Sequence, residues 1–202
     1  MVGRLLKIDD PHAPVPIFVE SLESDLTCFD AENYGTLILM DSEVEFHPLE
    51  ISKLENDVKK KGLSVMVVAD WYSEEVIPKL SFFDDNTHSD WDPITGGSNV
   101  PALNELLAPW GIAFGGGVVS GSLDLGGHSG KLASASHLVR FPSGGLIHYQ
   151  RVSHQSELLV NGGRYTAQAV TLGLFQSTDG PSSGRMVAFG DSSCMDDWKL
   201  KD

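Results

Sequence analysis

The fold is decided by residues 35–69, GTLILMDSEVEFHPLEISKLENDVKKKGLSVMVVA. They predict a strand, a helix and a second strand, the order from which a parallel sheet is built. Residues 35–40 are a continuous apolar run, typical of a strand buried on both faces. Residues 47–61 predict a helix, because Pro48 suits a first turn and Gly62 suits a helix end. Residues 63–69 form a second apolar run. This strand–helix–strand unit predicts two parallel neighbouring strands.

Further elements are expected on both sides of this unit. A short strand is predicted at residues 17–20, a helix at 74–82 capped by Ser73, and a helix at 101–109 that begins at Pro101, with Ser98 or Asn99 as its cap. Residues 112–114 predict another short strand. Beyond them, shorter runs broken by Gly, Ser and Pro predict antiparallel strands, at 118–125, 133–141, 145–152 and 167–176. Residues 185–189 predict a last core strand, and 194–202 the start of a helix.

Together these elements predict one α/β domain spanning residues 1–202, with a βαβ half over about 17–116 and antiparallel additions over about 117–202. The expected architecture is an open, mostly parallel sheet with appended antiparallel strands, flavodoxin-like or similar to the glutamine-amidotransferase fold. We expect a domain truncated at both ends, with its last helix cut short. Extension by one further helix is then expected to raise its melting temperature.

Composition narrows the classes of function. The chain has 202 residues, 41% hydrophobic residues and a formal net charge of −14, which argues against a nucleic-acid surface. No stretch approaches the length of a membrane span, and residues 1–7 lack the apolar core of a signal peptide. Two cysteines, Cys28 and Cys194, are too few for a secreted disulfide scaffold. They either pair or remain two separate thiols.

Catalytic chemistry finds no support in the residue patterns. Ser98 lies in a Gly-Gly-Ser-Asn string, but no histidine precedes it in the order that a subtilisin-type site needs. Ser192 follows Gly190-Asp191, yet no histidine comes after His154 to serve an esterase. Helix capping by Ser98, and amide binding by Asp191 and Ser192, are the preferred interpretations. An amidotransferase would place a cysteine after the central strand, where this chain has Asp70. The sequence therefore predicts no catalytic residues.

Two other residue groups are candidates for binding. Asp84, Asp90 and Asp92, with neighbouring Asp85 and His88, form either a loose hard-cation site or a solvated acidic loop; the spacing excludes an EF-hand. Four aromatic residues are placed at strand ends or in the loops that follow, where open sheets bind ligands. They are a candidate interface, with core packing as the alternative: Trp71, Tyr72, Trp91 and Trp110.

Several motifs carry a resemblance to a known family. They are CFDAENYGTL at residues 28–37, ADWY at 69–72, FDDNT at 83–87, DWDPITGGSNVPALNELLAPWGIAF at 90–114 and GDSSCMDD at 190–197. In these motifs the chain resembles the site-1 protease family, membrane-bound subtilisin-type enzymes. The resemblance covers residues 20–141 well and recovers at 184–197. It matches the region that follows the protease domain and none of the family's catalytic residues.

The resemblance implies a parent protein that is a calcium-dependent serine endopeptidase anchored in the membrane, acting in the lumen of the endoplasmic reticulum or Golgi. Its substrates would be membrane-bound transcription factors. The partner of this segment would be the protease domain of the same polypeptide, or a separate partner protein. No cofactor, nucleic acid or membrane contact is expected of the segment itself. The alternative is a freestanding flavodoxin-like domain that binds a ligand or a protein and has no protease attached.

Overall fold

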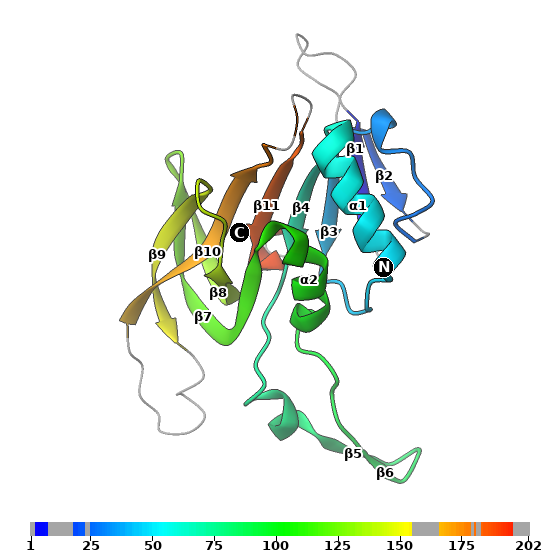
Figure 1. Cartoon of the computed structure of the whole chain (residues 1–202). Coiled ribbons are helices and arrows are strands. Elements are labelled where there is room, and N and C mark those ends of the chain that lie inside the picture. Colours follow the sequence, from blue (N-terminus) through cyan, green and yellow to red (C-terminus); the bar gives the residue numbers. More distant parts are fainter. Residues whose placement is uncertain are drawn as a thin grey trace.

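The computed structural model describes residues 3–7, 18–22, 25–154, 166–178, 180 and 183–195. A nine-stranded sheet runs through it in the order β2-β1-β3-β4-β11-β10-β9-β7-β8, and a separate two-stranded sheet is formed by β5 and β6 (Figure 1). The strands of one part of this sheet are β1 (Gly3–Lys7), β2 (Phe18–Leu22), β3 (Thr36–Met40), β4 (Ser64–Val68) and β11 (Arg185–Phe189). Strands β7 (Ala113–Leu125), β8 (His128–Arg140), β9 (Leu146–His154) and β10 (Thr166–Gln176) form the other part.

The predicted βαβ unit is confirmed. β3 and β4 pair in parallel, and β11 adds to β4 in parallel. The remaining neighbours in the large sheet pair antiparallel. The α/β class and the appended antiparallel strands are therefore as predicted, with the parallel core confined to β3, β4 and β11. Strand β1, which lies between β2 and β3, was not predicted from the sequence.

Two α-helices of the described chain, α1 (Pro48–Lys61) and α2 (Val100–Leu107), cover one face of the parallel strands (Figure 1). Alternate strand residues point to these helices and are fully buried, as with Leu37, Val65 and Met186. Burial in β3 alternates instead of being continuous, because its other residues are only half-buried on the opposite face. The prediction that β3 is buried on both faces was therefore wrong.

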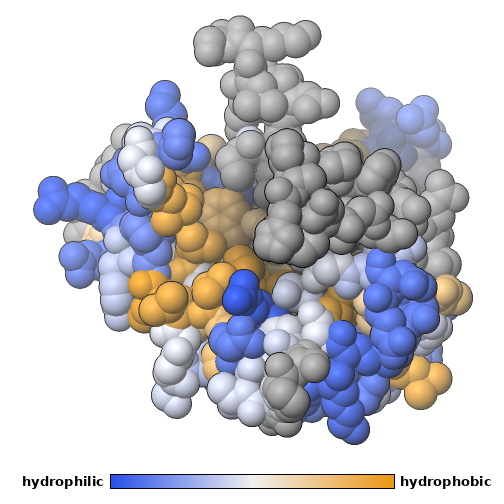
Figure 2. Space-filling model, turned by 90° about the horizontal axis from the view of Figure 1, so that it is seen from above, coloured by the Kyte–Doolittle hydropathy of each residue, from blue (hydrophilic) through white to orange (hydrophobic). Residues whose placement is uncertain are grey.

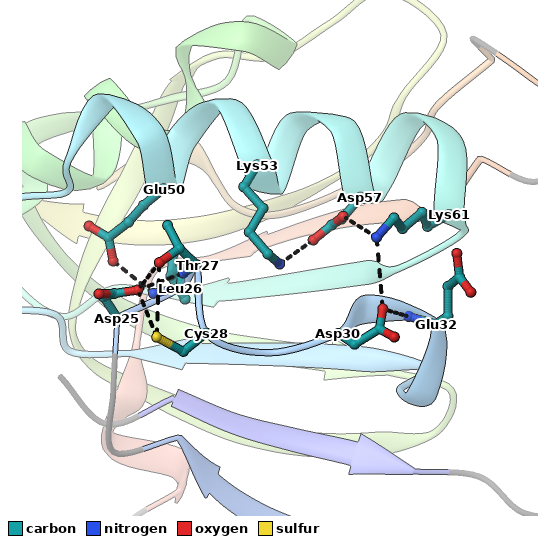
Figure 3. Close-up of polar contacts among 10 residues, drawn as sticks. All are labelled: Asp25, Leu26, Thr27, Cys28, Asp30, Glu32, Glu50, Lys53, Asp57 and Lys61. Carbon is teal, nitrogen blue, oxygen red and sulfur yellow. Dashed lines mark hydrogen bonds and ion pairs between the residues drawn. The ribbon is translucent and has the colours of Figure 1, made fainter.

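A polar seam fixes α1 to the loop before β3 (Figure 3). The buried Glu50 carboxylate accepts hydrogen bonds from the backbone amides of Leu26 at 2.8 Å and His47 at 2.7 Å. The second contact closes the helix N-terminus as half of a capping box. One turn from the other end, buried Asp57 pairs with Lys53 and Lys61. Lys61 also pairs with Asp30 of the loop, with 3.8 Å between Nζ and Oδ1, so charged groups join helix and loop at both ends.

The helix predicted at residues 74–82 is absent. The structure has a short 3-10 helix at Ile77–Leu80 followed by a hairpin of β5 (Phe82–Asp84) and β6 (Ser89–Trp91). Pro78 explains the error, because a proline in a helix interior lacks the required N–H and restricts the preceding residue. The hairpin projects away from the body of the molecule (Figure 1). We define the arm as residues 74–94.

The antiparallel half curls back onto the end of the parallel core. Two side-chain to backbone bonds of Asn104 with Phe114, at 2.8 and 2.9 Å, join α2 to the start of β7. The middle of β8 then reaches the residue after β11, where the Ser136 amide donates to the Gly190 carbonyl at 2.8 Å. The predicted strand at residues 112–114 is the beginning of β7, which is much longer than expected. Of the helix predicted at 194–202, only residues 194 and 195 are described, and they end a 3-10 helix at Ser192–Met195.

Candidate functional site

The carboxyl ends of β3, β4 and β11 meet at one edge of the sheet, where open α/β sheets bind ligands. Asp70 follows β4, and Gly190 and Asp191 follow β11. The Gly97-Ser98-Asn99 turn that opens α2 lies at the same edge, with the Gly97 amide donating to the Trp71 carbonyl at 2.8 Å. This edge is the place where the fold would put an active site.

Asp70 is held from several sides. Its amide donates to Ser98 Oγ at 2.9 Å, and its carbonyl accepts from Ser136 Oγ at 2.7 Å. One carboxylate oxygen accepts from the Trp71 amide at 2.7 Å and from Ser134 Oγ at 3.3 Å. Ser98 and Ser136 are fully buried. The backbone and one carboxylate oxygen of Asp70 are therefore used to join the end of β4 to β8 and to the start of α2.

Asp191 has a similar role at the end of β11. Its side chain is fully buried, and its two oxygens accept from the Ala133 amide at 2.7 Å and the Ser193 amide at 2.9 Å. The contact with Ser193 confirms that Asp191 binds backbone amides after the last strand. The contact with Ala133 was not predicted, and it joins β8 to the same edge.

Gly190 permits the close approach of β8. A Cβ atom added to it would lie 1.8 Å from the Ser136 carbonyl oxygen, well inside any real contact distance. The sequence signal for this packing is a run of small residues, Ala133-Ser134-Ala135-Ser136. Its meaning becomes clear only in the folded structure, where the run lies opposite Gly190. The edge is therefore filled by the chain's own backbone and by serine hydroxyls.

The two serines considered as candidate nucleophiles, Ser98 and Ser192, are buried in the packing at this edge. Ser98 binds Asp70 instead of capping α2; Asn99 caps the helix, its Oδ1 accepting from the Ala102 amide at 3.1 Å. Capping by Asn99 is as predicted, and capping by Ser98 was wrong. Ser192 is buried. Among the described residues, the rings of His137 and His148 contact the backbone carbonyls of Gly117 and Asp124, respectively.

The four aromatic candidates separate into two kinds. Trp110 is only 5% exposed and belongs to the main hydrophobic core, so its place in the predicted interface is corrected to a core role. Trp71 and Tyr72 are half-buried at the base of the arm. Burial raises the pKa of Tyr72 above its ordinary value, and the negative charge of Glu74 is a second, smaller cause. Trp91 is 51% exposed on β6.

The arm carries more exposed apolar surface than the sequence had suggested. Phe82 is 58% exposed, Phe83 is 56% exposed and Ile94 is 92% exposed. The same segment contains six acidic residues and a single lysine, Lys79. An isolated two-stranded hairpin is at best marginally stable in water. Exposed aromatic rings on such an element, with Phe82 and Trp91 opposite each other on its two strands, indicate a contact surface.

The acidic loop at the tip of the arm is closed by its own hydrogen bonds. Asp84 accepts from the Thr87 amide at 3.0 Å and the Thr87 hydroxyl at 2.7 Å, and these bonds hold the pKa of Asp84 below its ordinary value. Thr87 Oγ1 also accepts from Trp91 Nε1 at 2.8 Å. Within the residues that the structure describes, no group of three His, Cys, Asp or Glu side chains is placed to hold a metal ion. Asp84, Asp90 and Asp92 thus form no ready cation site.

Cys28 is an exposed free thiol beside α1, 3.5 Å from Asp25 Oδ1, to which it donates (Figure 3). Asp25 also accepts from the hydroxyl and the amide of Thr27, and these bonds lower the pKa of its carboxyl. The side chain of Cys194, the other member of the proposed pair, lies outside the described residues.

The fold and this edge define a class: an amidotransferase-like α/β domain whose usual ligand edge is filled by its own chain. Comparison with known families specifies the class further. The family model described as "MBTPS1, fourth GATase-like domain" matches residues 14–201, and the chain belongs to that family.

Curated relatives agree with this assignment. The chain is 44% identical over 185 residues to "Subtilisin-like protease SBT6.1" of Arabidopsis thaliana. It is 44% and 42% identical over 181 residues to "Membrane-bound transcription factor site-1 protease" of Rattus norvegicus and Homo sapiens. Each match covers 89% of this chain and 17% of the relative, so the chain spans about a sixth of the length of these proteins. Among the described residues, no helix is long and apolar enough to cross a membrane.

Proposed function

We propose that this chain is a non-catalytic domain of a subtilisin-type serine endopeptidase related to site-1 protease. The filled carboxyl edge of the parallel strands carries this proposal. Asp70, Ser98 and Asp191, the polar residues that could serve chemistry there, are bound to backbone groups of the same chain. A site whose polar residues hold the chain's own backbone in this way presents no nucleophile and base in mutual contact for a substrate.

The parent protein, on this proposal, processes membrane-bound transcription factors in the lumen of the endoplasmic reticulum or Golgi. Membrane anchoring and peptide hydrolysis then belong to other parts of the polypeptide. The names of the relatives and the extent of each match support this division, since the chain corresponds to a small part of each relative.

The partner that we propose is the protease domain of the same polypeptide, contacted through the arm. The exposed rings of Phe82, Phe83 and Trp91 lie on an element that projects from the body. Interface energy concentrates in aromatic and arginine side chains, and burial of two or three rings would supply several kcal/mol. The acidic residues of the arm favour a contact surface that carries lysine or arginine.

Covalent labelling tests the absence of catalysis. The purified 202-residue chain is treated with a fluorophosphonate probe and assayed with peptide and ester substrates. We expect neither labelling nor hydrolysis. Labelling of Ser98 or Ser192 would refute the non-catalytic assignment.

Association tests the role of the arm. Binding of the 202-residue chain to the separately expressed remainder of its parent protein is measured by calorimetry for wild type, Trp91→Ala and Leu49→Ala. Leu49 is the control, because it is 71% exposed but lies on α1. We expect Trp91→Ala to weaken binding at least tenfold and Leu49→Ala to leave it unchanged, with the melting temperature of the chain little altered in both. Equal binding by all three proteins would exclude the arm as the contact.

A further inference from the structure

A pocket of about 450 Å³ lies in the antiparallel half, and none of the residues that line it belongs to the arm or makes the contacts that fill the carboxyl edge. It forms where the end of β8 passes over the paired strands β9 and β10. In the view from above, hydrophobic residues gather around a hollow on the side of the molecule that holds β7–β10 (Figure 2). The lining residues are His137, Leu138, Val139, Arg140, Phe141, Ile147, Tyr149, Gln168, Ala169 and Val170.

Two glycines set the position of one wall: Gly145, just before β9, and Gly173 on β10. The Phe141 ring lies against Gly145 and Gly173, and a Cβ atom at either position would come within 2.4 Å of the ring. The ring can therefore lie flat on the backbone only because both residues lack a side chain. The wall is built into the strands themselves.

Apolar side chains around the pocket face solvent. Val139 is 61% exposed, Tyr149 is 62% exposed and Ile147 is 39% exposed. Each square ångström of such apolar surface that a ligand covers contributes about 25 cal/mol. The volume also falls within the range of small-molecule sites, roughly 300–1,000 Å³. The pocket can thus take an apolar body of small-molecule size.

The polar side chains of the pocket lining include a cation and can bind a ligand. Within the described chain, the Arg140 guanidinium, the Tyr149 hydroxyl and the Gln168 amide have no hydrogen-bond partner, and no carboxylate lines the pocket. The His137 ring is oriented by its Nδ1, which donates to the Gly117 carbonyl at 3.2 Å. An unpaired arginine is unexpected in a chain of net charge −14. Its planar guanidinium matches the geometry of a carboxylate or another oxyanion.

We propose that this pocket binds a small organic anion, with an oxyanion group on Arg140 and an aromatic or aliphatic body against Val139, Ile147 and Phe141. Tyr149 and Gln168 supply further donors at the mouth. This inference is independent of the proposed function, because the residues that line the pocket are neither those that fill the carboxyl edge nor those of the arm.

A fluorescent anion of this chemistry, 8-anilinonaphthalene-1-sulfonate, serves as the probe. It is titrated against the 202-residue chain for wild type, Arg140→Gln and Arg151→Gln. Arg151 is the matched control, because it is an exposed arginine on β9 outside the pocket lining. N-phenyl-1-naphthylamine, which has a similar aromatic body and no sulfonate, is titrated in parallel. Cooperative thermal unfolding of each variant verifies that it is folded.

We expect saturable binding at one site in the wild type. Loss of a charge-assisted contact should weaken sulfonate binding by about tenfold to a hundredfold in Arg140→Gln, and by less than about twofold in Arg151→Gln. The uncharged probe should bind wild type and Arg140→Gln equally. The proposal is overturned if the sulfonate does not saturate, if both arginine variants lose affinity equally, or if the uncharged probe depends on Arg140 as strongly as the sulfonate does.

Discussion

Replacement of Asp191 by alanine should destabilise the domain strongly, because its carboxylate is a structural acceptor. The side chain is fully buried and accepts from the Ala133 amide at 2.7 Å and the Ser193 amide at 2.9 Å. A hydrogen bond to a charged group contributes about 1.5–3 kcal/mol, and removal of the acceptor leaves both amides without it. We therefore expect Asp191→Ala to lower the free energy of unfolding by about 3–5 kcal/mol.

Asp191→Asn separates the two contacts. The amide side chain keeps one acceptor oxygen and turns an NH₂ group toward the second backbone donor, so about half of the loss should remain. For a chain of this length, 1 kcal/mol corresponds to roughly 2–4 °C in melting temperature. The alanine variant should thus melt about 10 °C below wild type. Urea unfolding followed by tryptophan fluorescence, with calorimetry as the second measurement, gives both quantities.

Asp92→Ala is the matched control, because Asp92 is an exposed aspartate on the arm. It should change the free energy of unfolding by less than about 0.5 kcal/mol. If Asp191→Ala is as stable as Asp92→Ala, the carboxylate does not hold β8 against the end of β11. The account of the filled edge would then be wrong, and Asp191 would be open to a chemical role.

Three further predictions follow from individual contacts. Gly190→Ala should unfold the domain or lower its melting temperature sharply, because the added Cβ would lie 1.8 Å from a backbone oxygen; a normal circular-dichroism melt would contradict this. Glu50→Ala should cost about 2–3 kcal/mol in urea unfolding, because two backbone amides lose a buried carboxylate, whereas Ser52→Ala on the exposed face of α1 should cost little. The Asp84 pKa lies below its ordinary 3.8, so the carboxylate should stabilise the hairpin above that pH and lose this effect as the pH falls through the lowered pKa. Carbon-13 titration of Asp84 should show the lowered value, Thr87→Val should raise it, and no difference between the two proteins would exclude the Thr87 hydroxyl as a cause.

Local sequence patterns determined much of the fold. Hydrophobic runs at residues 35–40 and 63–69, with a capped helix between them, are sufficient to specify a parallel βαβ unit, because each element's period and ends are local properties. The antiparallel strands were predicted for the same reason. The arm was missed, because Pro78 interrupts a helical pattern and the hairpin that replaces the helix has only three residues in each strand.

The filling of the ligand edge by the chain's own residues was decided by tertiary structure alone. Asp70, Ser134 and Asp191 are far apart in the sequence, and only the curl of the antiparallel half brings β8 across the ends of β4 and β11. The sequence alone indicated that no catalytic residues occur in a recognised order, and it carried the resemblance to the site-1 protease family. Whether Trp110 was core or surface, and whether Arg140 lay in a pocket, depended on packing between distant strands. Such packing leaves no periodic signal in the sequence, because its contacts join residues whose separation along the chain follows no fixed spacing.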